Sequence, residues 1–135
     1  MFVERRDGAI VGAYRQLQPG LAEEWLAADD AGLAAFLAGP VAEISDRQFA
    51  QGLAGLGLIS EVEAEEWVAA GTLPAAILAL VEQLPEVGRF PARMLLRGAT
   101  RFAFGHPLAD AFAGLADPPW STEARAAFWR HCASL

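Results

Sequence analysis

The sequence predicts a mainly α-helical fold with a small N-terminal antiparallel β element. Residues 2–16 alternate between apolar and polar side chains around an Asp-Gly pair, which is typical of a short β-hairpin. From residue 44 onward, serine caps, glycine stops and prolines mark out a series of short helices. We therefore expect about six short helices, packed as an orthogonal bundle behind a β-hairpin.

Two parts are expected along the chain. Residues 1–42 would form a docking element made of the hairpin and a short helix, and residues 43–135 would form the helical domain. With 135 residues in total, the chain is long enough to bury a core without disulfides or metals, so we expect both parts to form one compact unit.

Asp7 and Gly8 supply the positive φ angles of a tight turn between two strands. A lone hairpin is marginal in water, so this one must gain a third strand, pack on helices or pair with another chain. Residues 21–28 fit a helix by composition and a third strand by length, and both interpretations stay open. Asp29 or Asp30 then caps a short helix that ends at Gly39-Pro40. Its expected buried stripe is Leu33, Phe36 and Leu37.

The later helices are set by their start and stop signals. Ser45 caps the first, and Ser60 with Glu63 forms a capping box for the second, which ends at Gly71 in a left-handed conformation. The core face of the first is expected to carry Phe49, Leu53 and Leu56. The expected helices are 45–57, 60–70, 75–84, 87–104, 108–115 and 123–133.

Residues 87–104 carry arginines at 89, 93, 97 and 101. Because four residues are close to one helical turn, Arg89, Arg93, Arg97 and Arg101 form a ladder along one face of the expected helix. The spacing places Phe90, Met94, Leu95, Gly98 and Phe102 on the opposite, core-facing side.

Three interpretations of this arginine ladder stay open. The ladder can pair internally with the acidic helix at 61–66, which would leave nothing for a ligand. It can bind an external acidic partner, either a protein or a phosphate. It can also be solvated without any partner, since an exposed ion pair contributes only about 0–1 kcal/mol.

No constellation for catalysis is found, and we predict a protein that is not an enzyme and needs no cofactor or metal. The only histidines are His106, at a turn, and His131, which precedes Cys132 on a helix. Adjacent helix positions point about 100° apart, so His131 and Cys132 cannot form one metal site. The G-L-A-G-L-G run at 52–57 resembles a dinucleotide fingerprint, but it follows a helical pattern and not a strand.

Net charge and hydropathy limit the kinds of partner that the chain can bind. The formal net charge is −7, so the long-range field repels nucleic acid. No apolar run reaches the roughly 18 residues that a membrane helix needs, and the N-terminus lacks the apolar core of a signal peptide, so we expect a protein made in the cytoplasm.

A docking surface on the hairpin is predicted from its exposed apolar positions. The expected contacts are Phe2, Val3, Ile10 and Tyr14, with Trp25 and Trp120 as candidate aromatic anchors. Each of these residues could instead belong to the core.

The order of several motifs resembles small, uncharacterised proteins found in tail gene clusters of tailed bacteriophages and prophages. The motifs are V-E-R-R-D-G at 3–8, Q-P-G-L-A-E-E-W-L at 18–26, I-S-D-R-Q-F at 44–49, L-I-S-E-x-E-A at 58–64, G-T-L-P-A-A at 71–76, R-M-L-L-R-G-A-T at 93–100, H-P-L at 106–108 and F-W-R at 128–130. Arg89 and Pro91 depart from the uninterrupted helix expected in the central segment.

The resemblance implies a virion component of the tail, at the tail tip, baseplate or fibre attachment. It would be made in the host cytoplasm and would contact other tail proteins, or a second copy of itself, through the hairpin. One alternative is a tail or fibre assembly chaperone that is absent from mature virions. Another is a DNA-binding regulator using a helix-turn-helix at 45–70, although the glutamates of its second helix oppose DNA binding.

Overall fold

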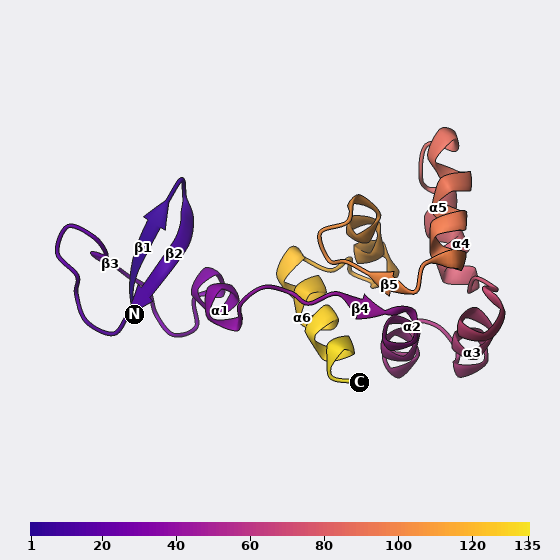
Figure 1. Cartoon of the computed structure of the whole chain (residues 1–135), viewed down its shortest axis with the longest axis horizontal. Coiled ribbons are helices and arrows are strands. Elements are labelled where there is room, and N and C mark those ends of the chain that lie inside the picture. Colours follow the sequence, from indigo (N-terminus) through magenta and orange to yellow (C-terminus); the bar gives the residue numbers. More distant parts are fainter. The chain divides into compact units, whose positions relative to one another are not determined.

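The computed structural model describes residues 1–135, and the chain divides into two compact units at residues 1–40 and 41–135 (Figure 1). The division lies two residues before the expected boundary. The expectation that the two form one compact unit stays a prediction. The predicted fold class is confirmed, with six α-helices, one 3₁₀ helix and an N-terminal β-hairpin.

The N-terminal unit is built on a three-stranded antiparallel sheet. Strands β1 (Phe2–Arg6) and β2 (Ala9–Tyr14) meet at Asp7 and Gly8, whose φ angles of 52° and 83° confirm the predicted tight turn. Strand β3 (Glu24–Trp25) pairs with the other edge of β1, giving the order β2-β1-β3. The segment at 21–28 therefore supplies the third strand that the hairpin needs.

Helix α1 (Ala31–Ala38) packs against β2 and begins at Asp30, whose carboxylate accepts a hydrogen bond of 2.9 Å from the Leu33 amide. Only Leu33 of the predicted stripe is buried. Phe36 and Leu37 are exposed, so that part of the prediction is wrong. Helix α1 is apolar on every side, so its sequence does not reveal which face meets the sheet. A unit of this size cannot cover the remaining faces of the helix.

The helical unit begins with two helices that both carry the predicted cap. Ser45 forms a capping box with Gln48, and Ser60 forms one with Glu63. Gly71 ends the second helix in the left-handed conformation, at a φ of 71°. The bounds are α2 (Asp46–Gly55), α3 (Glu61–Ala70), α4 (Ala75–Glu82), α5 (Glu86–Gly98), the 3₁₀ helix η1 (Pro107–Leu115) and α6 (Thr122–Ala133).

An aromatic cluster fills the core of this unit. Phe49 of α2 is fully buried, and its ring lies 4.8–5.8 Å from five other aromatic rings. The indole N–H groups are satisfied, since Trp67 donates to the Leu96 carbonyl at 3.0 Å and Trp129 to the Phe102 carbonyl at 3.2 Å. The five rings belong to Trp67, Phe102, Phe112, Phe128 and Trp129.

A short strand pair interrupts the helix that was predicted over 87–104. Strand β5 (Arg101–Phe102) pairs antiparallel with β4 (Ile44–Ser45), so α5 ends at Gly98 and not at Phe104. The extended conformation at Ala99 ends the helix, and Phe102 is buried on the strand. Arg101 therefore leaves the arginine ladder, which is a correction to the sequence analysis.

Helix α5 also buries a different face from the one predicted. Ala92 and Leu96 are buried, whereas Phe90, Met94 and Leu95 are exposed. Helices α4 and α5 pack against each other, and Ala92 and Leu96 belong to the buried core. Leu56, which was also expected on a core face, is exposed and lies one residue beyond the end of α2.

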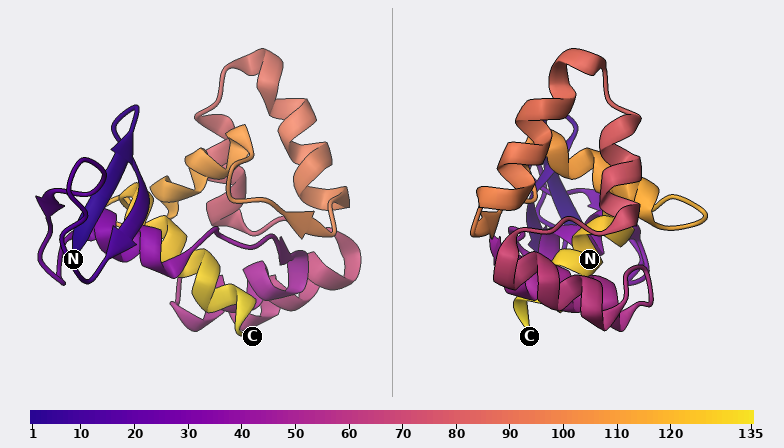
Figure 2. Two further views of the ribbon diagram at one scale, coloured as in Figure 1. Left: turned by 60° about the vertical axis from the view of Figure 1, so that its left-hand side comes forward. Right: turned by 90° about the vertical axis from the view of Figure 1, so that its right-hand side faces the viewer.

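The α4–α5 hairpin projects from the remainder of the helical unit (Figure 2). Helix α4 also packs against η1, and α2 packs against both α3 and α6. None of the helices is both long and apolar enough to cross a membrane alone; α3 and α4 meet the length and composition requirement only as a pair, with a bend of 72° between them.

Candidate functional site

Three of the predicted docking residues form a row across the N-terminal sheet. In the strand register, Phe2 lies directly opposite Tyr14 on one side and Trp25 on the other. Directly opposed residues on neighbouring antiparallel strands point to the same face of a sheet. Tyr14, Phe2 and Trp25 therefore form an aromatic row on one face, and we call this the aromatic row.

Gly12 sets the position of the Tyr14 ring. A Cβ atom at residue 12 would lie 2.9 Å from the Tyr14 ring and hydroxyl and 3.2 Å from the Glu4 carboxylate. The Tyr14 hydroxyl lies 3.4 Å from Oε2 of Glu4, to which it donates a hydrogen bond. The tyrosine ring thus lies flat over a bare stretch of backbone, on the same face as Phe2.

The other two predicted docking residues lie on the opposite face. Val3 is only 2% exposed, and Ile10 is half-buried beside Gly32 of α1. These residues attach the sheet to the helix and are not available to a partner. Arg5 and Glu24 form an ion pair of 2.6 Å, and this pairing holds the pKa of Glu24 below its ordinary value and raises that of Arg5.

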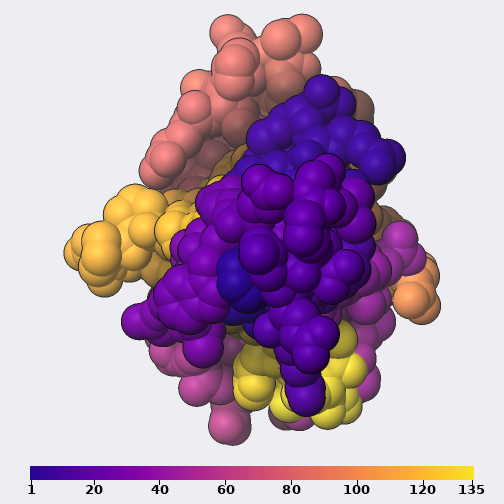
Figure 3. Space-filling view, turned by 90° about the vertical axis from the view of Figure 1, so that its left-hand side faces the viewer, coloured from indigo at the N-terminus to yellow at the C-terminus, as the bar shows by residue number.

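Trp25 is the most exposed member of the aromatic row. Its side chain is 61% exposed and lies on β3, an edge strand of two residues. A tryptophan buries up to about 250 Å² in a protein interior, so this exposure leaves roughly 3–4 kcal/mol of unused hydrophobic burial. Figure 3 shows the surface of this unit in indigo and purple, with the hairpin tip at its upper right.

The arginine ladder does not form the internal network with residues 61–66. Arg89 instead donates to the Leu84 carbonyl at 3.0 Å and lies 3.5 Å from Glu82. Arg101 pairs with Glu43 at 2.5 Å. Arg93 and Arg97 form no ion pair, so these two are the ladder positions open to an acidic partner.

Glu63 of the acidic helix binds backbone amides and not the arginine ladder. Its carboxylate accepts hydrogen bonds from the amides of Ser60 at 3.1 Å and Ala75 at 3.0 Å, and these bonds lower its pKa. The glutamate thus joins the start of α3 to the start of α4. At the α3–α4 turn the contact with α5 is made by backbone, because Gly71 lies against the Arg97 carbonyl.

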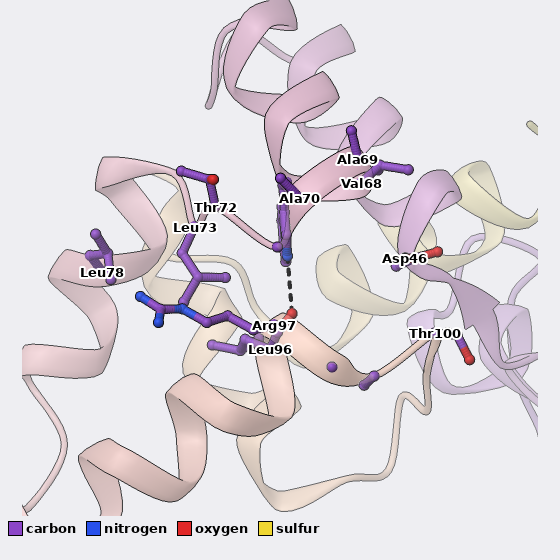
Figure 4. A pocket seen from close by; sticks show the side chains of 14 residues that line it. Asp46, Val68, Ala69, Ala70, Thr72, Leu73, Leu78, Leu96, Arg97 and Thr100 are labelled. Carbon is purple, nitrogen blue, oxygen red and sulfur yellow. Dashed lines mark hydrogen bonds between the residues drawn. The ribbon is translucent and has the colours of Figure 1, made fainter.

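A pocket of about 660 Å³ lies beside this contact (Figure 4). Its polar lining consists of Asp46, Thr72, Arg97 and Thr100, and in Figure 4 the Arg97 side chain extends past Leu73. No imidazole or thiol lines the pocket.

His106 and Cys132, the reactive residues noted in the sequence, have structural roles, as does Trp120. His106 caps η1 by accepting a hydrogen bond of 3.1 Å from the Leu108 amide at Nδ1. Cys132 is buried against Gly52 of the glycine run, and burial raises the pKa of its thiol to about 12. Trp120 stacks on Phe128 at 4.8 Å and packs against the core. No group of three or more His, Cys, Asp and Glu side chains is placed to hold a metal ion.

One surface was missed by the sequence analysis. Val87, Phe90 and Met94 of α5 are 87%, 64% and 54% exposed and point away from the buried Ala92 and Leu96. The three follow the i, i+3, i+7 spacing of a helix contact face. The signal was present in the sequence, but the larger apolar residues were assigned to the core.

Comparisons with protein-family models, with curated proteins and with solved structures found no match to this chain. A functional assignment therefore rests on the chain's own residues.

Proposed function

We propose that this protein is a non-enzymatic virion component of a phage tail and acts through protein–protein contacts. The tail context comes from the ordered motifs between residues 3 and 130. The observation that carries a binding role is the aromatic row, of which Trp25 is 61% exposed. On this proposal the protein is made in the host cytoplasm and ends in the tail, at the tip, the baseplate or the fibre attachment, bound to other tail proteins.

The aromatic row has the composition of a binding hot spot. Tryptophan, tyrosine and arginine are enriched in hot spots, and the rigid tryptophan and tyrosine rings bury large areas at small entropic cost. Phe2 and Tyr14 are half-buried, so they are already ordered before a partner arrives, and Trp25 supplies the area that remains to be covered. An apolar patch on the neighbouring tail protein is the complement we expect.

The test compares Trp25→Ala with Leu37→Ala. Leu37 is 58% exposed in the same unit but lies on α1, outside the aromatic row, so it is a matched control. Trp25→Ala should weaken binding to the partner tail protein about 30-fold or more, as expected for a hot-spot residue, and Leu37→Ala should change it little. Equal effects of both substitutions would argue against the aromatic row.

Mass spectrometry of purified virions tests the tail assignment itself. The proposal requires the protein in mature particles. Its presence in assembly intermediates together with absence from finished virions would favour the assembly chaperone.

The DNA-binding alternative has little electrostatic support. Glu61, Glu65 and Glu66 are all exposed on α3, the second helix of the α2–α3 pair, where they would repel phosphates. Salt-sensitive binding to duplex DNA would revive this alternative.

A further inference from the structure

The exposed stripe of α5 formed by Val87, Phe90 and Met94 has arginines along one edge. We call these three residues the α5 stripe. Arg93 and Arg97 follow the same side of the helix and form no ion pair within the chain. An uncovered apolar stripe with unpaired charges beside it is characteristic of a protein interface.

A complementary surface lies between α2 and α3 of the same unit. The groove there has a volume of about 640 Å³ and a floor of small residues, which lets another helix approach closely. Glu61 and Glu65 border it, and neither forms an ion pair within the chain. The other lining residues are Arg47, Ala50, Gln51, Ala54, Gly55, Ala64, Val68 and Ala69. We call this surface the α2–α3 groove.

Charge and spacing match between the two surfaces. Arg93 and Arg97 are one helical turn apart, as are Glu61 and Glu65, so both pairs present their charges at about 6 Å intervals. Arg47 is the one cation at the groove. Its guanidinium is already engaged by the side-chain oxygen of Gln51 at 2.7 Å.

Val87 and Phe90 at the start of α5 cannot reach the α2–α3 groove of their own chain. Figure 2 shows the start of α5 at the far end of the helical unit from α2 and α3. We propose that the α5 stripe of one copy docks in the α2–α3 groove of a second copy, with Arg93 and Arg97 against Glu61 and Glu65.

Pairing of the α5 stripe with itself matches fewer charges than the head-to-tail contact does. A parallel pair of α5 helices would set Arg93 and Arg97 against the opposite edge of the second helix, which carries no carboxylate. An antiparallel pair centred between Phe90 and Met94 would bring Arg93 beside its own counterpart, which is destabilising, and would match only Arg97 with a carboxylate, that of Glu86. The head-to-tail contact gives both arginines a glutamate.

A head-to-tail contact leaves one stripe and one groove open at the ends of every dimer. Further copies can therefore add until a ring closes or a filament forms. The contact uses none of the residues of the aromatic row.

The experiment uses the full chain with one surface disabled at a time, measured by sedimentation velocity. Phe90→Asp disables the stripe, and Val68→Asp disables the groove. Each variant alone should be monomeric, with association weakened about 30-fold or more, because each places a charge at the centre of the contact. Leu37→Asp, at a similarly exposed apolar site outside both surfaces, should associate like the unaltered protein.

Mixing the two variants gives the decisive result. Phe90→Asp retains its groove and Val68→Asp retains its stripe, so an equimolar mixture should form dimers and nothing larger. If the unaltered protein is monomeric at all concentrations, or if Val68→Asp still associates while Phe90→Asp does not, the proposal is overturned.

A charge exchange provides a second test that leaves the apolar surfaces intact. Arg93→Glu with Arg97→Glu should weaken self-association, as should Glu61→Arg with Glu65→Arg. Combining all four substitutions in one chain should restore it, since opposite charges again meet across the contact. Failure of the fourfold variant to recover, with its circular dichroism unchanged, would contradict the assigned pairing.

Discussion

Replacing Gly52 with alanine tests how tightly α2 and α6 pack in the helical unit. A Cβ atom at this position would meet Sγ of Cys132 closer than real Cβ atoms approach other atoms, and would lie 3.1 and 3.3 Å from two ring atoms of Phe128. Both neighbours are buried, at 0% and 5% exposure, so neither can move aside into solvent.

Two opposing effects set the size of the change. Alanine in a helix interior is favoured over glycine by about 1 kcal/mol. Overpacking a buried contact costs about 1–3 kcal/mol, and the overlap at Gly52 involves two side chains at once. We expect the overlap to prevail, with a net loss of about 1–2 kcal/mol and a melting temperature lower by roughly 4–8 °C.

Urea unfolding followed by tryptophan fluorescence measures this loss, because Trp67 and Trp129 are buried in the same core. Gly55→Ala is the matched control. It lies in the same helix with nothing within 4 Å of the added methyl group, so it should leave stability equal or slightly raised. Adding Cys132→Ala to Gly52→Ala should recover stability by removing Sγ. If Gly52→Ala is as stable as Gly55→Ala, the inferred tight contact is wrong.

The remaining predictions concern the helical unit. Glu63→Gln should lower the urea midpoint at neutral pH; because the folded pKa of Glu63 is lowered from 4.5, its contribution is present above that value, and the difference should disappear as the pH falls through the lowered pKa. Cys132, with its pKa raised to about 12, should resist thiol reagents at about pH 8 until urea unfolds the protein. Arg125→Ala should cost about 2–4 kcal/mol in thermal or urea unfolding, because it removes a buried guanidinium that donates to the Phe104 carbonyl and lies over the Phe104 ring. Gly71→Ala should cost about 1–2 kcal/mol by the same measurement, since alanine disfavours its left-handed φ.

Local signals predicted the helix starts well. Ser45 and Ser60 begin α2 and α3 because their capping requires only a few neighbouring residues. The turn at Asp7 and Gly8 and the stop at Gly71 are local in the same way. Elements whose structure depends on pairing with a distant segment were predicted less well from the sequence. Phe102 suits a helix by spacing, but its strand pairing with Ile44 lies far away in the sequence.

The candidate sites were predicted only in part, again because they depend on contacts between distant segments. The hairpin residues were identified, but separating Phe2 and Tyr14 from Val3 requires knowledge of which face of the sheet α1 covers. The α5 stripe was missed because Phe90 and Met94 look like core residues to a rule that equates size with burial. An exposed apolar residue can be recognised only after the true core has been located.

The short pairing of β4 with β5 also has a consequence for folding kinetics. Glu43, which precedes β4, and Arg101 of β5 are 58 residues apart, and between them lie α2 to α5. Closing so long a loop carries an entropic penalty that local helix formation does not. We therefore expect the helices to form early and the β4–β5 pairing to close late, so that substitutions there chiefly accelerate unfolding.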